Sequence, residues 1–129
     1  MTIIKDYFDE LEFWDTAFFK QPIVKKGELI IPARQVVVYK EHPLNHTDEN
    51  MTLPECNLIF TNPKSSVRLV SEYLDPENYK GFKPSYIISD GSFPQINELT
   101  ELFVLEGTLE NPPSWVKWEI ESVSFSLEV

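Results

Sequence analysis

The stretch SWVKWEIESVSFSLEV, residues 114–129, decides the fold that the sequence predicts. Apolar and polar residues alternate along it, which is typical of a strand with one buried face. The apolar positions have even numbers from Val116 to Ile120 and odd numbers from Val123 to Val129. Because a one-residue slip turns every side chain to the other face, this strand must contain a bulge or a bend. Such a strand passes between the sheets of a sandwich or rounds the corner of a barrel.

The segments before this strand also favour β structure. We expect ELTELFVLEGTLE, residues 98–110, to form a hairpin with it through Asn111-Pro112-Pro113. The chain contains ten prolines, most of them 8 to 13 residues apart. The segments between the prolines are short and rich in β-branched residues, which favours strands separated by turns. The sequence therefore predicts a single, mainly β domain over residues 1–129, either a small antiparallel β-sandwich or a curled barrel.

One segment near the start has a different period. Tyr7, Leu11, Trp14 and Phe18 recur at helical spacing with acidic residues between them. This pattern predicts a short N-terminal helix over about residues 4–12. The chain is then expected to become extended by Phe18, because Pro22 follows shortly.

Size and cysteine content predict a cytoplasmic protein without a membrane segment. No run of the 129 residues approaches the roughly 20 apolar residues of a membrane helix, and MTIIKDYFDE at the start has no continuous apolar segment. The single cysteine, Cys56, cannot form an internal disulfide, which agrees with a reducing compartment.

The charge is strongly negative and unevenly distributed. The net charge is −10. Residues 1–15 carry five acids and one base, whereas residues 90–129 carry eight acids and one base. Charge of this kind maintains solubility, or it forms a surface that attracts a basic protein partner. Direct nucleic-acid binding is disfavoured because phosphate contacts require clustered Lys and Arg. The candidate contacts are Asp6, Asp9, Glu10, Glu12 and Asp15, together with Glu98, Glu101, Glu106 and Glu110.

Both histidines and the cysteine fall in the stretch EHPLNHTDENMTLPEC, residues 41–56. A zinc ion bound by His42 and His46 would need further ligands, with Cys56, Asp48 or Glu49 as candidates. A metal-dependent enzyme centred there is one hypothesis. The other hypothesis is a polar loop, because Pro43 separates the histidines and turn-forming residues follow. We expect the loop, with Cys56 buried, and we expect no cofactor.

Other catalytic or ligand-binding patterns are weak, so enzyme activity is not the favoured prediction. Glu119 and Glu121 lie on one strand face, as a pair of catalytic carboxylates in a hydrolase would. Such a pair is also commonplace on the solvent-exposed face of a strand. A small-ligand or carbohydrate-binding module remains the alternative, with Trp115 as its exposed aromatic contact, since alternation places Trp118 inside. The sequence does not determine whether the protein forms homo-oligomers.

Three stretches carry a resemblance to a known group: HPLN at 42–45, SSVRLVSEY at 65–73 and SWVKWEIESVSFSLE at 114–128. Together they resemble small bacterial proteins of the toxin-immunity type. The resemblance implies a non-enzymatic cytosolic binding protein that neutralises a basic toxin. It brings no catalytic motif and therefore assigns no site residue.

Overall fold

The computed structural model describes residues 2–129, and it confirms that the chain is mainly β. Ten strands make up one sheet. They are β1 (Ile3–Lys5), β2 (Leu11–Glu12), β3 (Phe18–Phe19), β4 (Ile23–Lys25), β5 (Glu28–Val38), β6 (Met51–Asp75), β7 (Lys80–Phe82), β8 (Tyr86–Ser89), β9 (Glu101–Leu109) and β10 (Ser114–Glu128). None of the helices among the described residues is long and apolar enough to cross a membrane.

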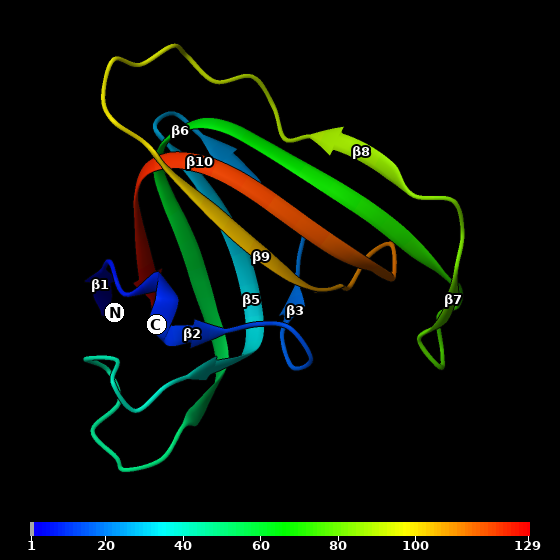
Figure 1. Ribbon diagram of the computed structural model, residues 1–129, viewed down its shortest axis with the longest axis horizontal. Helices are drawn as coiled ribbons and strands as arrows, with labels where there is room; N and C mark the ends of the chain where they lie inside the picture. Colours follow the sequence, from blue (N-terminus) through cyan, green and yellow to red (C-terminus); the bar gives the residue numbers. More distant parts are fainter. Residues whose placement is uncertain (1) are drawn as a thin grey trace.

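The two longest strands, β6 and β10, form the centre of the sheet. They pair in antiparallel fashion from Ser114 opposite Glu72 to Glu128 opposite Asn57. The register shifts between Glu121 and Ser122, at the point where the apolar positions change phase. The predicted bulge is therefore confirmed, and Figure 1 shows both strands bending sharply along their length.

The shorter strands flank the two halves of this pair. The predicted hairpin is confirmed, because β9 pairs with the first half of β10 from Ser114 opposite Leu109. On the other side, β5 pairs with the first half of β6. Phe18 of β3 is opposite Arg34 of β5 and also opposite Thr108 of β9. The pairing therefore runs from β5 through β6, β10 and β9 to β3, and returns to β5.

The core lies on the concave side of the bent strands and is dominated by aromatic rings. Trp118, Phe19, Phe60 and Phe125 are each at most 1% exposed. The predicted burial of Trp118 is thus confirmed. A Cβ atom on Gly107 of β9 would lie 2.7 Å from the Phe19 ring, so only glycine allows β9 to pack this closely.

The predicted helix over residues 4–12 is wrong. The segment contains only a three-residue 3-10 turn, η1 (Phe8–Glu10), and strands on both sides of it. Ile3–Lys5 pair with the end of β10, and Leu11 pairs with Val38. Asp6 and Tyr7 both have left-handed backbone conformations, which turn the chain sharply between these strands. Tertiary strand pairing has overridden the local helical spacing.

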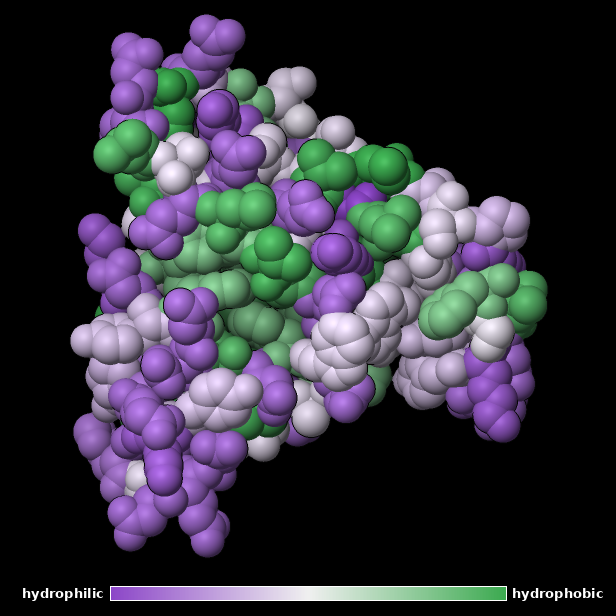
Figure 2. All heavy atoms as spheres, in the orientation of Figure 1, coloured by the Kyte–Doolittle hydropathy of each residue, from purple (hydrophilic) through white to green (hydrophobic). Residues whose placement is uncertain are grey.

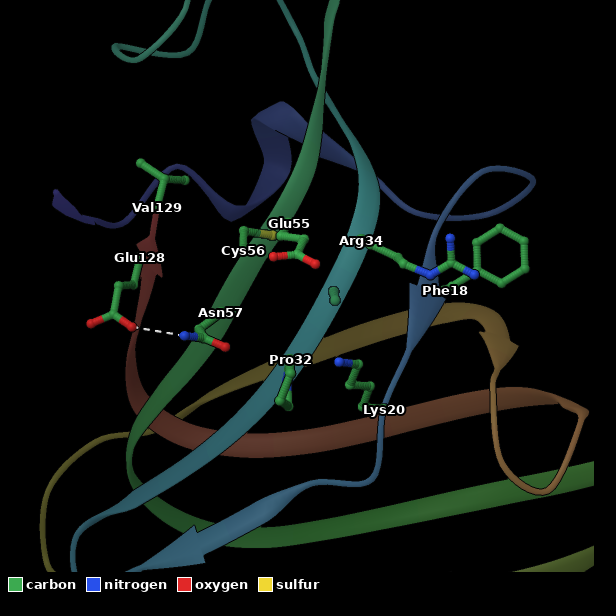
Figure 3. A pocket seen from close by; sticks show the side chains of 10 residues that line it. Phe18, Lys20, Pro32, Arg34, Glu55, Cys56, Asn57, Glu128 and Val129 are labelled. Atoms are coloured by element: carbon green, nitrogen blue, oxygen red, sulfur yellow. Dashed lines mark hydrogen bonds between the residues drawn. The ribbon is translucent and has the colours of Figure 1, made fainter. Parts of the chain in front are cut away.

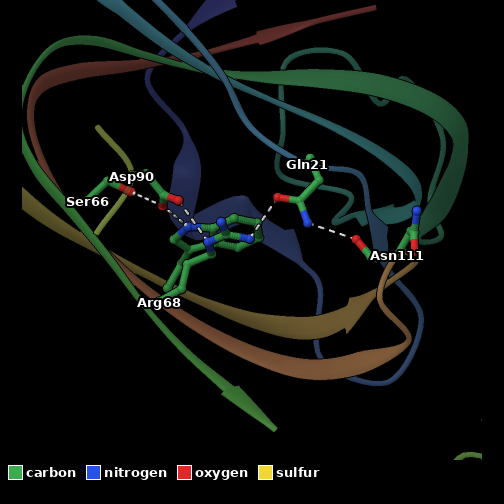
Figure 4. Close-up of polar contacts among 6 residues, drawn as sticks. Gln21, Ser66, Arg68, Asp90 and Asn111 are labelled. Atoms are coloured by element: carbon green, nitrogen blue, oxygen red, sulfur yellow. Dashed lines mark hydrogen bonds and ion pairs between the residues drawn. The ribbon is translucent and has the colours of Figure 1, made fainter. Parts of the chain in front are cut away.

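A buried polar network ties the segment after β8 to the inner face of the sheet (Figure 4). Arg68 and Asp90 are each 5% exposed and form an ion pair of 2.8 Å. Ser66 Oγ and Trp118 Nε1 each donate a hydrogen bond of 2.7 Å to Asp90 Oδ2. Arg68 also donates a hydrogen bond to Gln21 and lies over the Trp118 ring. Asp90 therefore accepts two hydrogen bonds and has a cationic partner in Arg68, as a buried carboxylate requires.

Candidate protein-binding site

A hollow of about 680 Å³ lies between the N-terminal segment and β9. It brings together four of the acids that the sequence singles out, from segments more than 90 residues apart. These are Asp6, Asp9, Glu10 and Glu101. The other lining residues are Tyr7, Phe8, Leu102, Phe103, Val104, Ser124 and Phe125. We call this feature the acidic hollow.

The folded β10 strand explains why these distant acids meet. Its second half pairs with β1, and its first half pairs with β9, from Ser122 opposite Glu101. The Asp6 N–H donates a hydrogen bond of 2.8 Å to the Phe125 carbonyl, just beyond the end of β1. The left-handed turn at Asp6 and Tyr7 then directs the chain through η1 along one side of the hollow.

Aromatic rings form the floor of the acidic hollow. Phe8 projects from η1 into the core, with its ring centroid 5.1 Å from those of Phe103 and Phe125 in edge-to-face geometry. Sequence reasoning missed these three residues as part of a site, because alternation identifies Phe103 and Phe125 only as core positions. Phe103 and Phe125 are almost fully buried, so the aromatic surface beside the carboxylates that is accessible to a cationic side chain belongs to Tyr7 and Phe8.

None of the four carboxylates of the acidic hollow forms an ion pair with another side chain of residues 2–129. The residues that line it include no Lys, Arg or His. The ion pairs within residues 2–129 involve other acids, namely Glu110, Glu121, Asp90 and Glu72. The formal charge of the lining is therefore −4, which attracts positively charged partners over distances of about a Debye length, roughly 10 Å.

The remaining predicted acids are not part of this hollow. Glu110 forms an ion pair with Arg34, and Glu106 is half-buried opposite Lys117. Glu12 lies near Tyr39, where burial and the Glu12 carboxylate raise the pKa of the tyrosine. Asp15 and Glu98 are exposed in loops.

Trp115 lies on the outer face of β10, as the alternation predicts. Its ring is 5.2 Å from that of Trp14 in edge-to-face geometry, and Trp14 is half-exposed. Because Trp115 is half-buried, most of the exposed aromatic surface of this pair belongs to Trp14.

A second cavity, of about 470 Å³, lies over β5 and β6 (Figure 3). It mixes charges of both signs, and several of its polar groups already have partners. Arg34 pairs with Glu110 and lies 4.5 Å from the centre of the Phe18 ring. Asn57 donates a hydrogen bond of 2.8 Å to Glu128. This cavity therefore offers less uncompensated charge than the acidic hollow.

The structure does not assemble His42, His46 and Cys56 into one site. His42 and His46 lie in the loop between β5 and β6, where His42 is buried and His46 is exposed. Cys56 is buried on β6, and this burial raises the pKa of its thiol to about 12. In residues 2–129, no group of three or more His, Cys, Asp or Glu side chains is placed to hold a metal ion. Residues 41–50 of this stretch lie in the loop between β5 and β6, whereas residues 51–56 belong to β6.

His42 gives this loop a pH-dependent stability. Its Nδ1 accepts a hydrogen bond of 3.0 Å from the Leu44 N–H, and burial lowers the pKa of the imidazole below 6.5. The unfolded chain therefore binds a proton more readily than the folded chain. We expect the contribution of His42 to be complete above about pH 6.5 and to be lost progressively as the pH falls below that value.

The variant His42→Asn is expected to remove this part of the pH dependence, because the Asn side chain can accept the same Leu44 hydrogen bond without titrating. The free energy of unfolding, measured by urea denaturation from pH 8 to pH 5, should fall less steeply than in the unmodified protein. His46→Asn, at the exposed loop position, is the matched control. Equal slopes for all three proteins would contradict the role of His42.

Comparison of the chain with protein-family models, with curated proteins and with solved structures finds no match.

Proposed function

We propose that this protein is a non-enzymatic, cytosolic binding protein that holds a basic protein partner at the acidic hollow. The observation that carries the proposal is the meeting of four carboxylates, from the N-terminal segment and β9, which form no ion pair within residues 2–129. Such a surface steers a basic partner toward the site and accepts its Lys or Arg side chains.

Neutralisation of a toxin is the most concrete form of this function. A nuclease that binds phosphate has a basic cleft, and a surface with a formal charge of −4 can occupy that cleft by charge complementarity. The resemblance of residues 42–45, 65–73 and 114–128 to toxin-immunity proteins supports this form of the proposal.

Of the two predicted architectures, we infer the curled barrel. The return of the pairing from β9 through Phe18 and Phe19 to β5 supports it, together with the bend of β6 and β10. In this arrangement η1 covers one end of the core, and the acidic hollow lies at that end.

The proposal is tested by neutralising the acidic hollow with Asp6→Asn, Asp9→Asn, Glu10→Gln and Glu101→Gln in one variant. Immobilised protein first captures its partner from a lysate of the host at low salt. The rate of association with the purified partner is then measured for each variant. We expect the neutralised variant to associate at least about tenfold more slowly, because electrostatic steering toward the site is lost.

The matched control removes four exposed acids elsewhere, with Glu41→Gln, Asp48→Asn, Glu49→Gln and Glu77→Gln. It changes the net charge by the same amount but leaves the acidic hollow intact. A similar loss of rate in both variants would assign the effect to net charge alone. Unchanged rates in the neutralised variant would refute binding at the acidic hollow.

A further inference from the structure

The strand β9 has one edge that is only partly paired. Along one side it pairs with β10 from Glu101 to Leu109. Along the other side its strand partner among residues 2–129 is β3, which reaches only Thr108 and Leu109. Figure 1 shows β9 running beside β10, with β3 near one end of β9.

Hydrogen bonds at the paired end show which backbone groups face this open edge. The Thr108 N–H donates to the Ala17 carbonyl, and the Glu110 N–H donates to the Phe19 carbonyl, both away from β10. Because successive residues of a strand direct their backbone groups to opposite edges, Leu102, Val104 and Glu106 share the direction of Thr108. Within residues 2–129 the N–H and C=O groups of these three residues that face away from β10 have no backbone partner, so they are available to an added strand.

This free edge borders the acidic hollow, since Leu102 and Val104 line it together with the four acids. The side chains of Leu102 and Val104 point to the outer face, where they are 59% and 43% exposed. Figure 2 shows exposed apolar side chains along the part of the surface that β9 crosses. Phe103 points to the opposite face and packs against Phe8.

We propose that an extended segment of the basic partner adds to β9 as a further strand, opposite Leu102, Val104 and Glu106. This inference rests on the proposed function and specifies how the partner binds. Side chains of an added strand alternate between the two faces. One set reaches Asp6, Asp9, Glu10 and Glu101, so it carries Lys or Arg. The other set lies beside Leu102 and Val104, so it is apolar or carries Thr.

A second copy of this chain is a poor occupant of the same edge. Pairing two β9 edges would bring the carboxylates of two acidic hollows together, and each chain already carries a net charge of −10. Like charges at such short range are destabilising. The uncompensated charge thus selects a basic strand and discourages self-association.

The test uses the peptide Lys-Thr-Lys-Val-Lys-Thr-Lys, blocked at both ends, and two N-methylated forms of it. One form carries N-methyl groups on the Thr and Val backbone nitrogens, and the other carries them on the inner Lys nitrogens. Both keep the same charge. Because only alternate N–H groups of an added strand face β9, one form should bind about tenfold more weakly or worse, and the other form should bind nearly as well as the unmodified peptide.

Hydrogen exchange followed by NMR gives a second, residue-level readout. With the peptide at about 100 times its Kd, exchange at the amides of Leu102, Val104 and Glu106 should slow by up to about 100-fold. The amides of Phe103 and Leu105, which face β10, should change little.

Three results would overturn the inference. Equal binding of both methylated forms, with binding still lost in the neutralised hollow variant, would leave the proposed function standing on electrostatics alone. No binding of any form to the intact protein, with partner association indifferent to neutralisation, would remove the proposed function as well. Slowed exchange at Leu102, Val104 and Glu106 on raising the protein concentration without peptide would assign the edge to a second copy.

Discussion

Replacing Asp90 with alanine is expected to lower the free energy of unfolding by about 3–5 kcal/mol. The substitution leaves the Arg68 guanidinium buried without its counter-ion, and it removes the acceptor of the Ser66 and Trp118 hydrogen bonds. Because domains of this size are stable by only about 5–15 kcal/mol, the variant should lie close to unfolding. Urea denaturation followed by Trp fluorescence measures the loss.

Two further variants separate the charge from the hydrogen bonds. Asp90→Asn keeps a carbonyl acceptor but removes the negative charge, so Arg68 remains uncompensated. Adding Arg68→Met to Asp90→Asn removes the buried positive charge, and the double variant is expected to be more stable than Asp90→Asn alone. Strictly additive losses would mean that the two residues do not depend on each other.

The second large effect is expected at Phe125. Truncation to alanine should lower the free energy of unfolding by about 3–5 kcal/mol, because the ring is 1% exposed and its removal leaves a cavity among Phe8, Phe60 and Phe103. The ring also belongs to the floor of the acidic hollow. Urea denaturation measures the stability, and association with the partner then shows whether the hollow keeps its shape.

Phe82→Ala is the matched control for this truncation. Its ring is 53% exposed on β7, where it stacks on Tyr73. Removing it should have a much smaller effect, of about 1 kcal/mol or less. Similar losses at both positions would contradict the assignment of Phe125 to the central core.

The central part of the fold could be predicted from the sequence because it depends on local alternation. The change of phase between Ile120 and Val123 indicates the bend of β10, and Asn111-Pro112-Pro113 indicates the hairpin. The N-terminal segment could not be predicted in this way. Its helical spacing is real, but strand pairing at Ile3–Lys5 and at Leu11 provides more stabilisation than an isolated helical turn.

The candidate site was only partly predictable for a related reason. The sequence identifies the acids, but it does not show that Asp6 and Glu101 meet whereas Glu110 is bound by Arg34. Asp90 likewise has no distinguishing pattern in the sequence, and only the folded sheet places it against Arg68. Long-range neighbours, which spacing along the chain does not specify, decide the role of each of these charges.

The central position of β10 has a consequence for how the protein is made. β10 pairs with β1, β6 and β9, yet it follows all of them in the chain. During translation, β1 lacks its strand partner among residues 2–129, and β6 lacks the neighbour on one of its two edges, until residues 114–128 leave the ribosome. The native sheet therefore forms only after this segment is synthesised. Until then, the strand edges that pair with β10 stay unpaired in the nascent chain. A chaperone that holds nascent chains has its greatest value during this interval.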